Sequence, residues 1–206
     1  MGSKTAIVDY GSGNLNSVRK AVERLDSDPL VTSTAKDILA AEKIILPGVG
    51  HFSQAMFNLR KLNLLGALNE AVTVKQKPVL GICLGMELMT TASQEGNVEG
   101  LGWLNARTIK FNLSDKTKYQ SPHIGWNQIR IRNSGALLKD IPNGSEFYFL
   151  HSYHLALENP SDVISETEYD YLFPSTIERE NIFGVQYHPE KSHEVGMKLL
   201  GNFLKM

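Results

Sequence analysis

The sequence predicts an α/β fold of three layers, in which helices flank a mostly parallel central sheet that carries a mixed or antiparallel extension. Two observations predict it. Short apolar runs alternate with amphipathic helical patterns through the first half, as in parallel sheets covered on both faces. Strand candidates then follow at short spacing with few helical patterns between them. The chain has 206 residues, 42% of them hydrophobic, and we expect one domain over residues 1–206.

The first half is predicted to contain four strands. Residues 5–9 are apolar on both faces and indicate a buried strand, and a glycine-rich turn at 11–14 precedes a helix over 15–25. Val18, Val22 and Leu25 share one stripe of that helix. The other elements expected in this half are strands at 29–32, 44–46 and 78–82, and helices at 37–42, 52–62, 64–74 and from residue 84.

The second half is predicted to be strand-rich, as hairpins or a mixed sheet extension. A last helix, from residue 191 or 192 to 204, packs Val195, Leu199 and Phe203. The strand candidates are residues 107–111, 126–131, 147–151, 162–166, 176–178 and 183–187.

The composition excludes several classes of protein. Lys and Arg number 21 against 22 Asp and Glu, and this balance gives no electrostatic basis for binding nucleic acid. The longest near-apolar run, residues 79–86, is far shorter than the roughly 18 residues of a membrane span. No basic and then apolar leader opens the sequence, so we expect a cytoplasmic protein. Cys83 is the only cysteine, which excludes an internal disulfide and a multi-cysteine metal site.

Cys83 lies in the pattern Gly81-Ile-Cys-Leu-Gly85, between an apolar strand and an apolar helix. This is the context of a nucleophile elbow with sulfur in place of a hydroxyl. The flanking glycines allow close backbone approach, and the N-terminus of the following helix favours a thiolate. The alternative is a small buried hydrophobic residue, the usual fate of a single cysteine.

A glycine-rich turn at residues 47–50 ends the preceding parallel strand, so we expect it beside the elbow at the carboxyl edge of the sheet. Its backbone N–H groups are able to stabilise an oxyanion. The alternative is a plain turn without chemistry.

A thiolate nucleophile needs a base, and the base needs an orienting group. His188 precedes Pro189, which holds it extended, so Glu190 faces the same way and reaches the imidazole. A surface loop with an incidental charge pair is the alternative. His151 and His154 have no third ligand nearby, and we expect polar core groups there; His123 has no assigned role.

No cofactor or metal is predicted. The Gly-x-Gly pair at 11–13 lacks the third glycine of a dinucleotide loop, because position 16 is Asn.

Together the motifs resemble the class I, or triad, glutamine amidotransferases over nearly the whole chain. Residues 81–86 (GICLGM) and 183–192 (FGVQYHPEKS) are the segments most specific for that class. Within it, the chain looks like the glutaminase subunits of imidazole glycerol phosphate synthases at residues 9–15, 47–52, 122–127 and 149–153.

The resemblance implies hydrolysis of glutamine to glutamate and ammonia by a Cys–His–Glu triad. Cys83 is then the nucleophile, His188 the general base and acid, and Glu190 the orienting carboxylate. Backbone N–H groups hold the oxyanion at Leu84, Val49 and Gly50. The family's substrate-binding positions fall on Gly48, Glu87, Glu95, Ser152 and Tyr153.

The resemblance also implies a protein partner. In the family, ammonia travels to a (β/α)8 cyclase subunit, forming a heterodimer that makes imidazole glycerol phosphate and aminoimidazole carboxamide ribotide in histidine biosynthesis. No synthetase domain follows residue 206, which suits a separate subunit. Asn14, Trp126 and Lys191 lie in motifs that the family uses near this interface.

One position departs from the family, which usually has Gln where this chain has Glu87. A carboxylate accepts hydrogen bonds but does not donate them as an amide does. Two alternatives to the histidine pathway stay open: ammonia supply to a sugar amidotransferase in surface-polysaccharide biosynthesis, and a non-catalytic scaffold of the same fold. An α/β-hydrolase is disfavoured, because its acid precedes the histidine.

Overall fold

The computed structural model describes residues 4–25 and 27–206. Its main sheet has eight strands in the order β2-β1-β3-β4-β14-β13-β12-β9. The strands from β2 to β14 pair in parallel, and the last four pair antiparallel, so the predicted mostly parallel sheet with an antiparallel extension is confirmed. The strands are β1 (Thr5–Val8), β2 (Pro29–Thr32), β3 (Lys43–Gly48), β4 (Val79–Cys83), β9 (Arg130–Ile131), β12 (Val163–Tyr169), β13 (Tyr171–Arg179) and β14 (Ile182–Val185).

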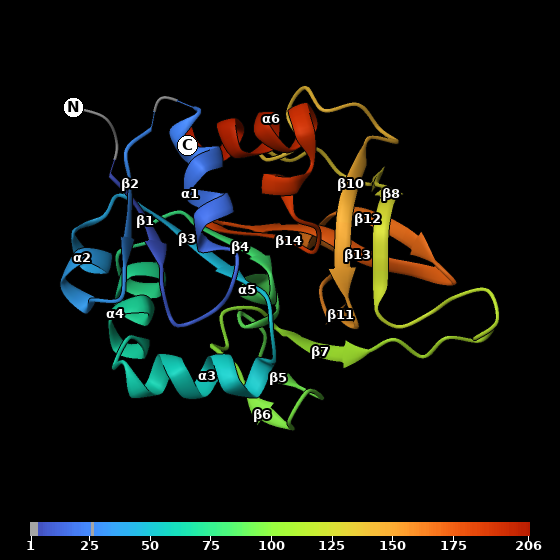
Figure 1. Cartoon of the computed structure of the whole chain (residues 1–206), viewed down its shortest axis with the longest axis horizontal. Coiled ribbons are helices and arrows are strands. Elements are labelled where there is room, and N and C mark those ends of the chain that lie inside the picture. The colour runs from blue at the N-terminus through green and yellow to red at the C-terminus, as the bar shows by residue number, and fades with distance from the viewer. Residues whose placement is uncertain (1–3, 26) are drawn as a thin grey trace.

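Two smaller sheets lie beside the main one (Figure 1). One has the order β11-β7-β5-β6, and the other is an antiparallel ribbon of β8 and β10. Their strands are β5 (Ala92–Ser93), β6 (Val98–Glu99), β7 (Ala106–Lys110), β8 (His123–Gln128), β10 (Glu146–His151) and β11 (Tyr153–Leu157).

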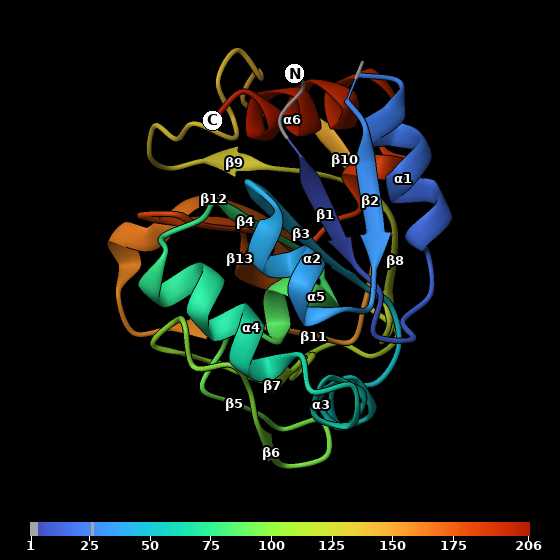
Figure 2. The ribbon, with the colours of Figure 1, turned by 90° about the vertical axis from the view of Figure 1, so that its left-hand side faces the viewer.

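Helices cover both faces of the main sheet and complete the predicted three layers (Figure 2). Side chains of α1 (Leu15–Glu23) and α6 (His193–Leu204) pack with Ile7 and Ile45, whereas those of α2 (Ala35–Ala40), α3 (Phe52–Lys61) and α4 (Leu65–Asn69) pack with Val8 and Ile44. Neighbouring residues of one strand thus enter opposite cores, because side chains alternate along a strand.

The structure differs from the prediction at several boundaries. β3 continues through Pro47 to Gly48, because its pairing with β4 extends to Cys83. The helix expected at 37–42 begins at Ala35, where the hydroxyl of Thr34 caps it. The helix expected at 64–74 becomes a π-helical turn from residue 70, the strand expected at 126–131 divides into β8 and β9, and β5, β6 and β11 were not predicted. The shortest helical turns are 160–162 and 189–191.

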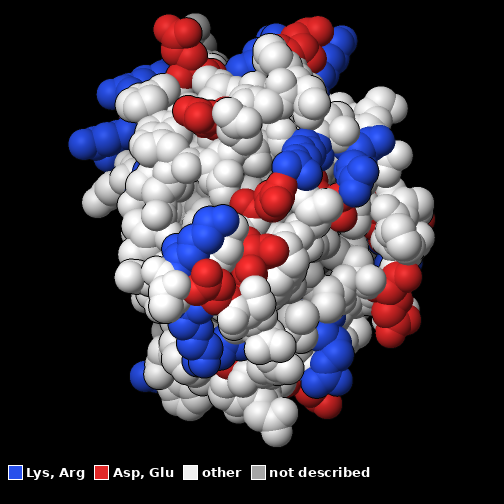
Figure 3. Space-filling model, turned by 90° about the vertical axis from the view of Figure 1, so that its right-hand side faces the viewer, with Lys and Arg blue, Asp and Glu red and all other residues white. Residues whose placement is uncertain are grey.

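No helix within the described residues is long and apolar enough to cross a membrane. The face of the molecule shown in Figure 3 carries basic and acidic side chains interspersed, without a large patch of one sign.

The short helix α5 (Leu84–Glu87) sits directly against β3 at Gly85. A Cβ added there would lie 1.7 Å from the carbonyl oxygen of Leu46, far inside van der Waals contact. A side chain at this position would push α5 away from the sheet edge.

We expect Gly85→Ala to lower the free energy of unfolding by about 3 kcal/mol or more, because the clashing atom is backbone. Gly66→Ala is the matched control: this glycine lies in α4 with open space around its Cβ position, so alanine should raise stability by up to about 1 kcal/mol. Urea denaturation of both variants measures the difference. Equal stability of the two variants contradicts the packing argument.

Candidate active site

Cys83 stands on a strained turn at the end of β4. Its backbone adopts φ 53° and ψ −114°, a conformation rare for residues other than glycine. A Cβ added at Gly81 would lie 2.6 Å from the amide nitrogen of Met86. The two flanking glycines therefore let α5 fold back against β3 and β4, which leaves the cysteine at the carboxyl edge of the parallel strands.

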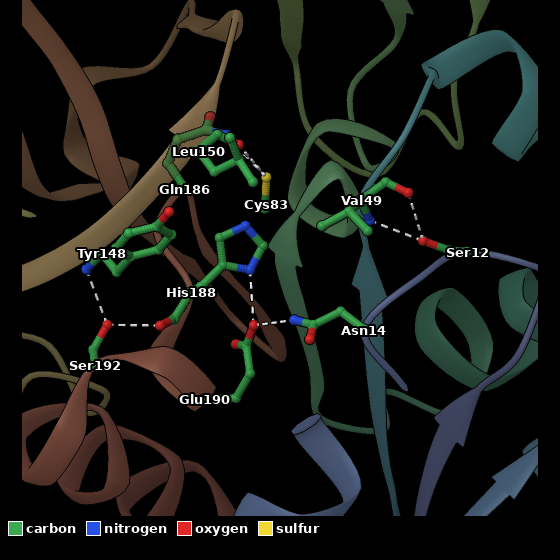
Figure 4. Close-up of polar contacts among 10 residues, drawn as sticks. All are labelled: Ser12, Asn14, Val49, Cys83, Tyr148, Leu150, Gln186, His188, Glu190 and Ser192. Carbon is green, nitrogen blue, oxygen red and sulfur yellow. Dashed lines mark hydrogen bonds and ion pairs between the residues drawn. The ribbon is translucent and has the colours of Figure 1, made fainter. Parts of the chain in front are cut away.

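His188 and Glu190 form a buried pair at the end of β14. Nδ1 of His188 lies 2.8 Å from Oε1 of Glu190, and their side chains are 1% and 0% exposed. The side-chain amide of Asn14 also donates to Oε1 of Glu190. Nε2 of His188 has no hydrogen-bond partner, and Figure 4 shows this edge of the ring turned toward Cys83. The imidazole thus lies between a carboxylate and a thiol with one nitrogen free.

The backbone of His188 is tied to the β10 strand through Ser192 (Figure 4). The hydroxyl of Ser192 donates to the carbonyl of His188 at 2.6 Å and accepts from the N–H of Tyr148 at 3.0 Å. The N–H of His188 in turn donates to the carbonyl of Tyr148 at 2.8 Å. Sequence reasoning missed Ser192 as a positioning residue, although it closes the segment that carries the histidine.

The thiol of Cys83 is held in its protonated form. Its Sγ donates to the carbonyl of Leu150 at 3.6 Å, and Nε2 of Gln186 lies 3.9 Å away. We expected the helix N-terminus to favour the thiolate, and the N–H of Leu84 acts in that direction. Burial, followed by the charge of Glu87, outweighs it and raises the pKa of Cys83 well above its ordinary value.

Glu87 is a buried carboxyl group beside this thiol. Its Oε1 accepts from Nε2 of Gln186 at 2.9 Å. Burial raises the pKa of Glu87 to about 8, the charge of Glu95 adds to the rise, and the hydrogen bond from Gln186 opposes it. Gln186 therefore bridges the thiol of Cys83 and a carboxyl group with a pKa of about 8.

Most of the predicted site residues line one cavity of about 200 Å³. Gly48, His188 and Glu190 are not in the lining, although Gly48 is the register partner of Cys83. Glu95 is held at the rim, where its Oε2 accepts from the N–H of Phe52 at 2.6 Å. The predicted residues in the lining are Val49, Gly50, Cys83, Leu84, Glu87, Glu95, Ser152 and Tyr153.

The Val49 peptide, predicted to bind an oxyanion, is held by Ser12 (Figure 4). The N–H of Val49 donates to the hydroxyl of Ser12 at 2.8 Å, and that hydroxyl donates to the carbonyl of Val49 at 3.0 Å. One serine thus occupies both polar groups of the residue. Sequence reasoning missed Ser12, because its partner is 37 positions away.

The residues that resemblance assigned to an interface divide into two groups. Asn14 lies inside the site, on Glu190. Trp126 is 46% exposed and stacks on His193, with ring centroids 4.9 Å apart, while the ammonium of Lys191 lies 5.6 Å from the centre of the Tyr148 ring.

In the part of the chain that the structure describes, no group of three or more His, Cys, Asp or Glu side chains is arranged to hold a metal ion.

Comparison with known proteins identifies the class. Residues 6–206 match the family described as glutamine amidotransferase class-I. A subunit HisH 2 of imidazole glycerol phosphate synthase from Methanococcus maripaludis is 45% identical, over 97% of this chain and 98% of that protein. HisH 2 of Pseudomonas aeruginosa is 40% identical, over 97% of this chain and 98% of that protein. HisH 1 of Campylobacter jejuni is 41% identical, over 98% of this chain and 99% of that protein. The solved structure of PurLQS from Thermotoga maritima, 16% identical, has a TM-score of 0.73 over 100% of this chain and 99% of that chain, and shows a shared fold.

The chain therefore belongs to the class I glutamine amidotransferases, an enzyme class, and the resemblance inferred from the motifs is confirmed. Within that class its relatives at 40–45% identity are HisH subunits, so it is a member of the HisH family.

We expect Glu87→Gln to lower the pKa of Cys83, because an ionised carboxylate beside the thiol opposes loss of its proton. The pKa of Glu87 is about 8, so near pH 7 its carboxyl is mostly neutral and the variant should match the wild type. Above pH 8 the carboxylate forms, and the variant should react faster. Alkylation of Cys83 by iodoacetamide between pH 7 and 10 measures this.

Glu95→Gln is the matched control for this experiment. Glu95 lines the same cavity, but its charge raises the pKa of Glu87 rather than that of the thiol. Removing this charge lets Glu87 ionise at a lower pH, so alkylation of Cys83 in this variant should not be faster than in the wild type at any pH. A Glu87→Gln profile that also overlays the wild type at every pH would falsify the electrostatic coupling.

Proposed function

We propose that the chain is a glutaminase in which Cys83, His188 and Glu190 act as a catalytic triad. One observation carries the proposal: Nε2 of His188 is buried and without a partner on the side of Cys83, while Nδ1 is held by Glu190. A base with one nitrogen oriented by a carboxylate and the other free is the arrangement that activates a nucleophile.

The proposed reaction has two halves. The Cys83 proton passes to Nε2 of His188, and the thiolate attacks the side-chain amide carbon of glutamine. The tetrahedral intermediate collapses to a glutamyl thioester as His188 returns the proton to the leaving ammonia. Water then attacks the thioester, with His188 again taking a proton, and glutamate leaves with the thiol restored.

The cavity supports binding of glutamine as its substrate. Glu87 and Glu95 line it. Glu95 provides negative charge for the α-ammonium group, and pairing with that group favours ionisation of Glu87, whose pKa of about 8 otherwise leaves it mostly neutral near pH 7. Ser152 and Tyr153 line the same cavity and are proposed to contact the substrate. Backbone N–H groups of Leu84, Val49 and Gly50 are proposed to hold the oxyanion.

We propose further that a bound partner activates the enzyme by releasing the Val49 peptide from Ser12. While the N–H of Val49 donates to that hydroxyl, it is not available to an oxyanion. Glutaminase activity of the subunit alone should therefore be low and rise when the partner and its ligand bind.

The proposed partner is a (β/α)8 cyclase subunit, which receives the ammonia and makes imidazole glycerol phosphate in histidine biosynthesis. The names of the relatives support this pathway. Trp126 and Lys191 are proposed to lie at that interface of a cytoplasmic heterodimer, with the single domain over residues 1–206 as one half.

A second candidate is ammonia supply to a sugar amidotransferase in surface-polysaccharide biosynthesis. Two observations favour it: the three relatives described above are all numbered HisH 1 or HisH 2, and Glu87 replaces the usual Gln. The test is to express the chain in a histidine auxotroph that lacks its own glutaminase subunit. Growth without added histidine supports the histidine pathway. No growth with a cyclase that binds the chain favours the second candidate.

We expect Cys83→Ala to abolish glutamate formation from glutamine while leaving partner binding intact, because the variant removes only the nucleophile. Coupled glutamate detection and size-exclusion of the complex measure the two properties. Retained glutaminase activity in this variant rejects the triad.

We expect Ser12→Ala to raise the partner-free glutaminase rate by about five- to thirtyfold, since one or two hydrogen bonds of roughly 1 kcal/mol each no longer hold the backbone of Val49. The rate with the liganded partner should change little. The contrary result, an unchanged or lower partner-free rate, shows that Ser12 does not restrain the enzyme.

A further inference from the structure

Two histidines of the β8–β10 ribbon have no role in the proposed reaction, although one of them lies at its cavity. His123 and His151 are register partners of the two strands, and His151 lines the cavity. They are 3% and 5% exposed, whereas Ile124 and Trp126 of β8 are 58% and 46% exposed. The ribbon therefore turns large apolar groups outward and its histidines inward, as side chains alternate along a strand.

The direction of hydrogen bonding is fixed at the β8 end. Oδ1 of Asn127 accepts from the N–H of Gln128 at 2.8 Å, and its Nδ2 donates to the carbonyl of Glu168 at 3.0 Å, which together assign the orientation of the amide. Nδ2 also lies 3.3 Å from Nε2 of His123, which must accept. His123 therefore carries its proton on Nδ1, and that N–H donates to Nε2 of His151 at 3.0 Å.

The hydrogen bonds of His151, at the other end of this hydrogen-bond chain, lead to the same assignment independently. Nδ1 of His151 lies 2.7 Å from the backbone carbonyl oxygen of Tyr153, which only accepts. The proton of neutral His151 is then on Nδ1, and its Nε2 is left to accept from His123. Backbone groups at both ends thus impose one direction on Asn127, His123 and His151.

Packing and burial keep both imidazoles neutral, as the chain requires. The ring of His123 is stacked on Phe149 and Tyr169, with centroids 4.9 Å and 4.0 Å apart. Burial lowers the pKa of His123 to about 4, and burial followed by the neighbouring His123 lowers the pKa of His151 well below its ordinary value. A protonated imidazole has no acceptor, so a charge on either ring would break the chain.

The hydrogen-bond chain ends on residues 150–153, the segment that borders the Cys83 thiol. The carbonyl of Leu150 accepts from the Cys83 thiol, the carbonyl of Ser152 accepts from the N–H of Phe111 at 3.1 Å, and the carbonyl of Tyr153 accepts from His151. Leu150, Ser152 and Tyr153 all line the cavity. Fixing these carbonyls sets where the side chains of Ser152 and Tyr153 stand.

We propose that Asn127, His123 and His151 are positioning residues, whose one-way hydrogen-bond chain holds the Ser152–Tyr153 segment in the geometry that binds glutamine. This role rests on the proposed glutaminase function. It also gives the exposed outer face of β8 a physical connection to the substrate cavity, because the same strand carries Trp126 outward and Asn127 inward.

Two variants of one residue separate the hydrogen bond from the packing. His123→Phe keeps a flat ring between Phe149 and Tyr169 but removes the donor to His151. His123→Asn loses the ring but keeps an N–H near the position of Nδ1. We expect His123→Phe to raise KM for glutamine about three- to tenfold, the effect of one lost hydrogen bond, with kcat changed less than about twofold. His123→Asn should stay near the wild-type KM.

The wild-type protein offers a second measurement that needs no variant and no activity. Long-range ¹H–¹⁵N correlation spectra report which ring nitrogen of a histidine carries the proton. We expect both His123 and His151 to be neutral and protonated on Nδ1. An Nε2–H tautomer or a charged ring at either residue contradicts the proposed hydrogen-bond chain. This measurement remains decisive even if His123→Phe does not fold.

The kinetic outcomes are equally decisive. A raised KM in both variants, in neither, or in His123→Asn alone overturns the positioning role, because the effect then does not follow the donor. If the wild-type chain with its partner neither binds nor hydrolyses glutamine, the proposed function fails and the role in substrate binding with it. The tautomers of His123 and His151 then still show whether the hydrogen-bond chain exists, so failure of the proposed function and failure of the hydrogen-bond chain are distinguishable.

Discussion

The contact between Gly85 and the carbonyl of Leu46 is the constraint on which the site depends. Only a residue without a side chain lets α5 lie so close to β3. That approach bends the backbone sharply at Cys83, which accounts for its positive φ. The sharp bend places the sulfur at the sheet edge, where β3, β14 and the β10–β11 connection each bring a polar group. A looser turn would leave the same residues without a common centre.

The surroundings of the Cys83 thiol keep it uncharged. Three carboxyl groups, Glu87, Glu95 and Glu190, surround the thiol and its base, and the described lining of the cavity includes no Lys or Arg. In this surrounding a thiolate is disfavoured, which protects a single buried cysteine from adventitious oxidation and alkylation. The same surrounding is suited to a substrate that carries its own positive charge. In the proposed mechanism, substrate binding and activation of the Cys83 thiol are thereby linked through charge.

The parts of the site that sequence could predict are those that short motifs encode. Cys83 between its glycines and His188 with Glu190 depend on neighbours within a few positions, and the structure brings them together. Ser12 on Val49 and His123 on His151 depend on pairing between distant segments, which no local pattern reports. The same holds for β11, whose partner strand β7 lies about 40 residues earlier in the chain. The predicted end of a strand was too early where strand pairing continued through a proline, as at Pro47 of β3.

The bond from Asn14 to Glu190 has a consequence for synthesis of the protein. These two residues are 176 positions apart. They follow β1 and β14, which are separated in the sheet by β3 and β4. Because a ribosome adds residues in order, a nascent chain holds the first loop and the elbow long before the carboxylate exists. In the proposed mechanism, glutamine hydrolysis therefore has to wait until the segment around Glu190 has been synthesised and has closed on the loop around Asn14.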